Sequence, residues 1–111
     1  MKSTLLALLF CCWLIMGCAT PAWAADVTNG AQVFEVHCLG CHANGGNIIR
    51  GGKNLKQKAL ERNGYATTEA IAQIVANGKA NMSAYKTRLT PAEIEDVAAY
   101  VLQQAAQNWP R

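Results

Sequence analysis

The pentapeptide Cys38-Leu39-Gly40-Cys41-His42 constrains this chain more than any other part of its sequence. The spacing Cys-x-x-Cys-His is the attachment signature of a c-type haem. One helical turn separates the two cysteines, so both thiols can reach the two vinyl groups on one edge of a porphyrin. The histidine follows at once and can bind the iron as its proximal ligand. We therefore predict one haem c per chain, held by thioethers from Cys38 and Cys41, with His42 as an axial ligand.

Two other kinds of site also use a Cys-x-x-Cys pair. A thioredoxin-like redox pair would lie near a βαβ pattern, and this sequence shows no strand pattern. A zinc site needs four ligands, typically from two such pairs. After Cys41 the chain has no further cysteine and only one histidine, His42. His37, just before the motif, is predicted to be an ordinary helix residue rather than a ligand.

The first 24 residues are predicted to be a secretory signal peptide that is removed. Lys2 precedes an apolar run, residues 5–17, which is too short to span a bilayer comfortably, and Ala22-Trp23-Ala24 offers a cleavage site. Cleavage would leave residues 25–111 as an exported domain of 87 residues. A second interpretation stays open. Cys18 ends a lipoprotein-like pattern, and lipidation there would tether the domain to a membrane.

Charge and size limit what the predicted mature domain can do. It contains nine basic and seven acidic residues, because Lys2 is the only one of the ten basic residues that lies in the leader. The resulting net charge of +2 is nearly cancelled by two haem propionates, which argues against a nucleic-acid partner. The three other cysteines lie in the leader, so no disulfide framework remains. A core this small usually needs additional stabilisation from a disulfide, a metal or a cofactor, and a buried haem would provide it.

Hydrophobic periodicity predicts an all-α domain of about four helices. The first is expected to begin near Thr28 or Asn29, either of which can cap it. A short helix is expected over Leu55 to Arg62, another from Thr67 or Thr68, and the last from the capping box Thr90-Pro91-Ala92-Glu93.

The first of these helices should end around the haem motif and cross the last one. We expect the crossing to bring Gly30 and Phe34 against Val97 and Tyr100. Glycines and asparagines in residues 43–52 predict a loop around the haem edge. One carbonyl in this loop should accept the Nδ1 hydrogen of His42, as is usual for metal-bound histidines, but the sequence does not say which.

Met82 is the only methionine of the predicted mature chain, so a thioether ligand to the iron would have to come from it. A lone methionine more often fills space in a core. Met82 instead lies in a polar loop, residues 79–88, far along the chain from His42. We predict that it is the sixth ligand, which raises the redox potential relative to a second histidine.

Together these residues resemble a class I cytochrome c, and most closely the cytochrome c6 family of cyanobacteria and algae. The shared stretches are Ala25-Asp26, Gly30-Ala31-Gln32-Val33-Phe34, the haem motif, Asn77-Gly78-Lys79 with Met82, and Asp96-Val97-Ala98-Ala99-Tyr100-Val101-Leu102. The resemblance covers essentially the whole predicted mature chain. It implies a single small class I cytochrome c domain, all-α and wrapped around one haem. It also implies a soluble electron shuttle in a thylakoid lumen or periplasm, from the cytochrome b6f complex to photosystem I or a terminal cytochrome oxidase.

Two positions depart from the family pattern. Family members commonly have proline after the methionine, where this chain has Ser83, and glutamine where it has Ile74. The aliphatic residue at position 74, together with the segment Asn47-Ile48-Ile49-Arg50, looks more like the c6-like side branches, which implies a lower potential and a different partner. We expect Ile74 to pack near the haem. Arg88 aligns with a basic residue thought to help docking, although it could equally be a solvated charge before a helix.

A one-electron carrier is thus the leading functional hypothesis. The second is a haem enzyme or gas sensor such as a peroxidase, which needs an open iron position and distal acid and base groups. With Met82 bound and no distal histidine, the sequence favours the carrier. The third, a membrane-tethered lipoprotein, depends only on Cys18.

Overall fold

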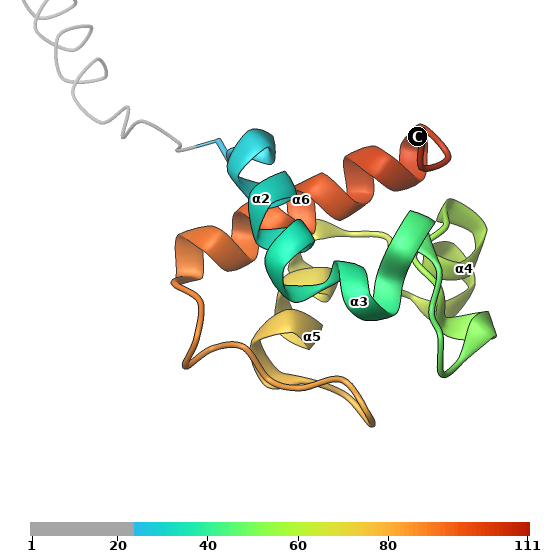
Figure 1. Ribbon diagram of the computed structural model, residues 1–111, viewed down its shortest axis with the longest axis horizontal. Coiled ribbons are helices and arrows are strands. Elements are labelled where there is room, and N and C mark those ends of the chain that lie inside the picture. Colours follow the sequence, from blue (N-terminus) through green and yellow to red (C-terminus); the bar gives the residue numbers. More distant parts are fainter. Residues whose placement is uncertain (1–23) are drawn as a thin grey trace, which may run out of the picture.

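The last helix, α6 (Pro91–Ala106), is the longest in the computed structural model, which describes residues 24–111 (Figure 1). Its predicted capping box is present. The Thr90 hydroxyl accepts from the Glu93 amide at 3.2 Å, and the Glu93 carboxylate accepts from the Thr90 amide at 3.1 Å. The predicted leader, including Cys18, lies outside the described residues except for Ala24. Between residues 24 and 111 no helix has the length and apolar character needed to cross a membrane.

The first described helix, α2 (Val27–His37), begins slightly earlier than the sequence predicts. Its N-cap is Asp26, whose carboxylate accepts from the Asn29 amide at 3.0 Å, so the predicted caps Thr28 and Asn29 are wrong. Both of those residues lie inside the helix. Aspartate is as good an N-cap as asparagine, and the side chain of Asn29 contacts α6 instead. Its side-chain amide donates to the buried carboxylate of Asp96 on α6 at 2.8 Å.

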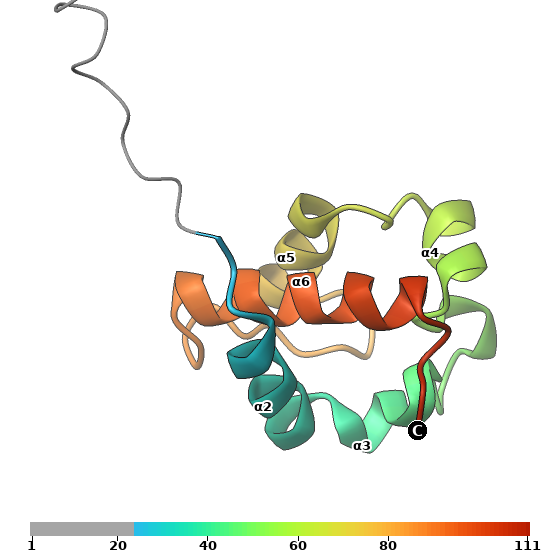
Figure 2. The same cartoon turned by 90° about the horizontal axis from the view of Figure 1, so that it is seen from above.

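Helices α2 and α6 cross where the sequence predicts, as Figures 1 and 2 show. Gly30 is buried at the crossing, and a Cβ atom there would collide with the Asp96 backbone and lie 2.9 Å from Tyr100 Cβ. One turn further along, the Phe34 and Tyr100 rings pack with centroids 5.3 Å apart. Val97 is 1% exposed in the same core. The predicted crossing is therefore confirmed, with the Asp96 backbone as the surface that Gly30 touches.

This contact predicts that Gly30→Leu destabilises the holoprotein. The larger side chain would force the two helix backbones apart, and overpacking of this kind typically costs about 1–3 kcal/mol. Chemical denaturation of the holoprotein measures the loss. Gly40→Leu is the matched control, because Gly40 is also helical and a Cβ there meets nothing within 4 Å. Equal stability of the two variants would contradict the prediction.

The remaining helices lie on both sides of α6. Figure 2 shows α2 and the short α3 (Leu39–His42) on one side, and α4 (Gln57–Asn63) and α5 (Thr68–Asn77) on the other. α4 is capped at its C-terminal end by Gly64, which has the left-handed φ of +77° that glycine tolerates. α5 is capped by Thr67, one of the two predicted residues. The expected loop at residues 43–52 is a loop that contains two single-turn 3₁₀ helices, η1 (Ala43–Gly45) and η2 (Gly51–Lys53).

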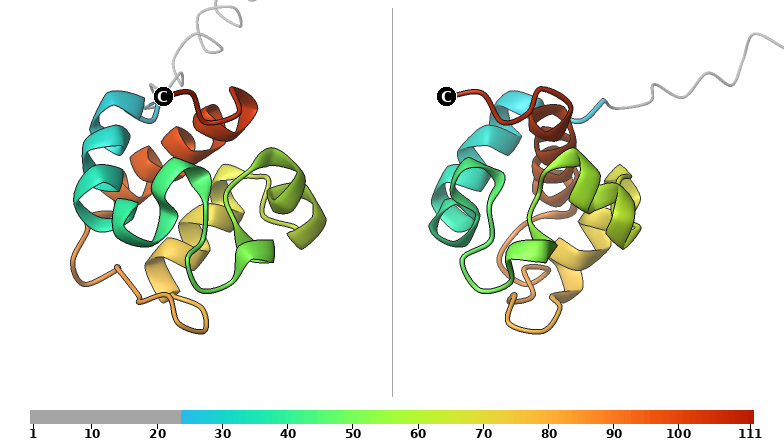
Figure 3. Two further views of the ribbon diagram at one scale, coloured as in Figure 1. Left: turned by 45° about the vertical axis from the view of Figure 1, so that its right-hand side comes forward. Right: turned by 90° about the vertical axis from the view of Figure 1, so that its right-hand side faces the viewer.

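The apolar faces of α2, α4, α5 and α6 meet in one core. Its members include Val33, Phe34, Leu60, Ile71, Val75, Val97 and Val101. The chain folds back after α6, as the ribbon in Figure 3 shows from two sides. Trp109, in this last segment, is buried against the core near η1. The sequence pattern did not predict this C-terminal closure. The all-α fold of about four main helices is confirmed.

Candidate haem-binding site

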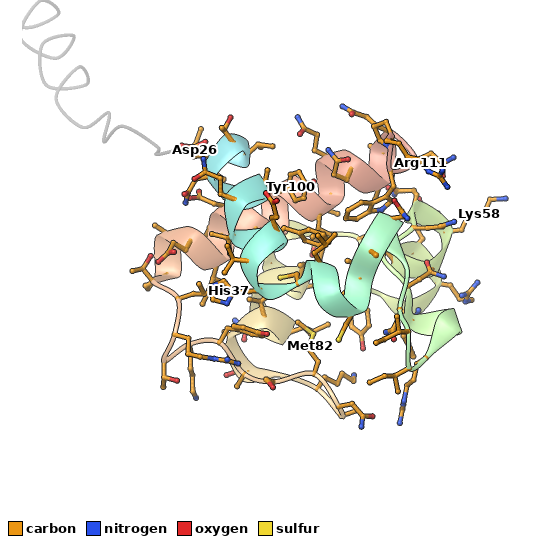
Figure 4. The ribbon with its side chains drawn as sticks, in the orientation of Figure 1. Asp26, His37, Lys58, Met82, Tyr100 and Arg111 are labelled. Carbon is orange, nitrogen blue, oxygen red and sulfur yellow. The ribbon has the colours of Figure 1, made fainter. Side chains whose placement is uncertain are left out.

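All five predicted site residues line one cavity of about 260 Å³. Cys38, Cys41 and His42 come from the segment between α2 and η1, Ile74 from α5, and Met82 from the loop between α5 and α6. Figure 4 labels Met82 on this loop, beneath α3. The apolar part of the lining includes Phe34, Leu55, Leu60, Ile71, Val75, Val97 and Val101. Residues 44 positions apart in the sequence, from 38 to 82, thus share one largely apolar chamber.

The two cysteines are free thiols on one helical turn. Cys38 lies between α2 and α3 as the C-cap of one and the N-cap of the other. Its carbonyl accepts from the amides of Cys41 at 3.2 Å and His42 at 3.0 Å. Burial raises the pKa of the Cys38 thiol to about 11, and the neighbouring Cys41 adds to the increase. A thioredoxin-like pair needs the opposite shift, because its reactive thiol has a lowered pKa. The Cys38 thiol therefore lacks the activation that a redox pair needs, and both cysteines line the cavity.

The His42 ring is oriented by a backbone carbonyl. Its Nδ1 lies 2.8 Å from the carbonyl oxygen of Gly46, which is the acceptor that the sequence predicts without naming. A carbonyl can only accept, so Nδ1 carries the hydrogen and Nε2 keeps its lone pair for a metal. The tight turn comes from Asn44 and Gly45, whose φ angles are +54° and +73°.

The Met82 loop is held to the end of α5 by backbone hydrogen bonds. Lys79 and Met82 exchange two of them, at 3.1 and 2.9 Å, and the Tyr85 amide donates to Val75 at 2.9 Å. The Tyr85 hydroxyl also donates to the His37 carbonyl at 3.2 Å, which ties the loop to α2. The position of Met82 is therefore set by the backbone on both sides. His37 lies at the rim as the last residue of α2, with its ring edge-on to Tyr85.

Sequence reasoning missed a cationic rim around the cavity. Lys79 donates to the Tyr65 hydroxyl at 2.7 Å, and this hydrogen bond lowers the pKa of the phenol. Lys53 lies on the same ring, 6.0 Å from its centroid, and Arg50 also lines the cavity. Of the described residues that line it, none is acidic. These residues lie in loops and follow no helical period. Their charge alone therefore did not indicate that they gather around one cavity.

The residues present fit a haem. The apolar lining suits the porphyrin, the two thiols suit its vinyl groups, and the cationic rim suits its propionates. A nitrogen and a sulfur donor line the same cavity from different segments of the chain. For the zinc alternative, residues 24–111 contain no group of three or more histidine, cysteine, aspartate or glutamate side chains that could hold a metal.

Known proteins share this sequence and this fold. Residues 25–101 match the family model described as cytochrome c oxidase, cbb3-type, subunit III. A cytochrome c6-like protein of Nostoc sp. is 55% identical over 109 residues, which cover 98% of this chain and 96% of that protein. Cytochrome c6 of Synechococcus sp. is 50% identical over 91 residues, or 82% of this chain and 81% of that protein. The chain belongs to the cytochrome c6 family.

A solved structure of the family agrees with this assignment. The crystal structure of cytochrome c6C from Synechococcus sp. superposes with a TM-score of 0.71 at 58% identity, and the match covers 73% of this chain and 99% of that one. Cytochrome c6 proteins are electron carriers rather than enzymes, and each carries one covalently bound haem c. Electron transfer and a haem c cofactor, both predicted from the motif and the resemblance, are thereby confirmed.

Proposed function

We propose that Cys38 and Cys41 would attach a haem covalently and that His42 and Met82 would ligate its iron. Each thiol adds across one vinyl group, so that the sulfur bonds to one carbon and the hydrogen goes to the other. The observation that carries the proposal is the common cavity, together with the Gly46 carbonyl that leaves His42 Nε2 free. When bound, the haem supplies a one-electron ferric/ferrous couple.

This arrangement suits a carrier better than a peroxidase or sensor. The His42 ring is oriented by the Gly46 carbonyl, and the Met82 backbone is fixed by its hydrogen bonds with Lys79. Little needs to move when the iron changes charge. A peroxidase needs an open iron position and an acid or base beside it. No carboxylate among the described residues lines the cavity, and the His37 ring lies edge-on to the Tyr85 ring with centroids 5.7 Å apart.

We further propose that the protein is an exported, soluble shuttle in the thylakoid lumen or periplasm of a cyanobacterium-like cell. The cytochrome b6f complex would be its donor, and photosystem I or a cytochrome oxidase its acceptor. Support comes from the family and from the leader pattern of residues 1–24. Mass spectrometry of the mature N-terminus separates cleavage after Ala24 from lipidation at Cys18, which would instead anchor the domain.

The absorption spectrum of the purified holoprotein tests the axial ligands. A methionine-ligated ferric haem has a weak charge-transfer band in the far red, and a carrier should show it in the wild-type protein. Absence of this band would reject Met82 as a ligand and favour the enzyme or sensor. A redox titration of the same sample then gives the midpoint potential, which decides which donors and acceptors are feasible.

A second candidate function is a low-potential c6-like carrier with a different partner. The observation that favours it is Ile74, which lines the cavity where ordinary family members have glutamine. Two effects compete at this position. An apolar residue excludes water, which raises the potential, whereas a glutamine amide aimed at the haem stabilises the electron-rich ferrous form. Other apolar residues around Ile74 already exclude water, so the missing amide should dominate and leave this protein with the lower potential.

Ile74→Gln is therefore expected to raise the midpoint potential. A net hydrogen-bond contribution of about 1 kcal/mol corresponds to roughly 40 mV for one electron. The visible spectrum should be largely unchanged. Ile74→Leu is the matched control, because it keeps an apolar side chain and adds no dipole. A fall in potential, or a change no larger than that of the leucine variant, would show that exclusion of water is the larger effect.

A further inference from the structure

We propose that Trp109, near the C-terminus, is a positioning residue for His42. The inference rests on the proposed function, because it concerns His42 as the iron ligand. In this proposal the indole holds the turn at Gly45 and Gly46 in place, and the Gly46 carbonyl orients the His42 ring. Four observations carry it, and they lead step by step from the end of the chain to the haem motif.

The first observation is the backbone conformation that places the indole against the core. Asn108 and Trp109 have φ angles of +57° and +52°, a left-handed conformation that non-glycine residues rarely adopt. The Trp109 amide donates to the Gln104 carbonyl at 2.8 Å, so the backbone turns back onto α6. Two consecutive unfavourable residues persist only where other contacts compensate for them. Here they bring a tryptophan from an exposed end of the chain to 9% exposure.

The second observation is what the indole holds. Its Nε1 hydrogen is donated to the Leu55 carbonyl at 2.9 Å. Leu55 in turn donates its amide hydrogen to the Gly45 carbonyl at 2.8 Å. Two consecutive hydrogen bonds thus connect the C-terminal tryptophan to η1. Leu55 is 54 residues from Trp109 in the sequence, so no local pattern specifies this connection.

The third observation is direct packing of the indole on the turn. A Cβ atom at Gly45 would lie 2.5 Å from Trp109 Cδ1 and 2.6 Å from Cε2, so the ring rests on the backbone of Gly45 itself. The other contacts of the ring keep it in place. Phe34 and Tyr100 lie on it, with centroid distances of 5.3 and 6.2 Å.

The fourth observation concerns Gly46, the residue after Gly45. Its carbonyl accepts the Nδ1 hydrogen of His42 at 2.8 Å. A hydrogen bond at this nitrogen orients the ring and makes the ligand more basic. A more basic histidine favours ferric iron, which lowers the potential. Loosening the turn should therefore weaken this bond and raise the potential.

Trp109→Phe tests the proposal, because phenylalanine keeps an aromatic ring and removes the Nε1 donor. We expect solvent exchange of the His42 Nδ1 hydrogen, followed by NMR in the ferrous holoprotein, to become about five- to tenfold faster. The midpoint potential should rise. Ala98→Gly is the control for stability alone. Ala98 is fully buried on α6 and takes part in none of the contacts above. This variant should lower stability while leaving both readouts as in the wild type.

The proposal would be overturned if Trp109→Phe kept the wild-type exchange rate and midpoint potential. It would also be overturned if Ala98→Gly changed both quantities as much as Trp109→Phe does. If Trp109→Phe yields no holoprotein, native-state exchange of the wild-type protein in low denaturant replaces it. The Trp109 indole hydrogen and the His42 ring hydrogen should then open together, and opening of the indole without His42 would reject the inference. Failure of the proposed function is distinguishable, because His42 resonances in the ferric wild type would then lack the large paramagnetic shifts of an iron ligand.

Discussion

Cys38→Ala and Cys41→Ala are each expected to abolish most of the stable covalent haem. Each variant removes one of the two thiols that lie on a single helical turn at the cavity. A single remaining thioether would hold the porphyrin by one edge carbon, so attachment and ring orientation should both suffer. The loss should also destabilise the fold, because the apolar cavity lining would face water instead of a porphyrin.

Haem staining after denaturing electrophoresis measures this loss. Cys12→Ala is the matched control, because it removes a cysteine in the predicted leader and leaves the motif intact. Its staining should equal that of the wild type. Full staining of both motif variants would reject Cys38 and Cys41 as the attachment residues. Full staining of only one variant would show that the cysteine remaining in that variant is sufficient for attachment.

Met82→Ala should remove the sixth ligand from the iron and so eliminate the far-red band completely. Met82 is the only methionine among the described residues, and the backbone around it is pinned to Lys79 on one side. No neighbouring thioether can replace it. The reduced protein should then bind carbon monoxide, which a six-coordinate carrier resists.

Two further variants sharpen the Met82 result. Ser83→Ala changes the adjacent residue of the same loop and should keep the band and the resistance to carbon monoxide. Met82→His should restore six-coordination but lower the midpoint potential, because a second histidine favours ferric iron relative to a thioether. An unchanged spectrum in Met82→Ala would mean that another group serves as the sixth ligand.

Several features of this protein could be predicted from sequence because the physics behind them is local. The thiols of Cys38 and Cys41 are brought together by one turn of helix, whatever the rest of the chain does. The capping box at Thr90 needs only four consecutive residues. The crossing at Gly30 was predictable for a related reason, since a glycine inside a helical pattern needs a close neighbour to offset its cost.

Tertiary structure decided the features that join distant loops. Nothing in the sequence indicated that Gly46 would orient His42, because every carbonyl in residues 43–52 was an equal candidate. The pairing of Lys79 with Tyr65 depends on two loops that meet only when α4 and α5 pack on α6. Loops follow no helical period, so these contacts had no signal along the chain.

The ends of the domain show the same division. At the start of the domain, Asp26 caps α2, and not Thr28 or Asn29. The side-chain amide of Asn29 instead donates to the carboxylate of Asp96 on α6. At the other end, two left-handed residues turn Trp109 inward against Gly45. The sequence by itself determined which side chains can hold a haem and which segments become helices. Only the tertiary structure decided how the His42 ring is oriented, because that depends on backbone groups whose neighbours come from the far end of the chain.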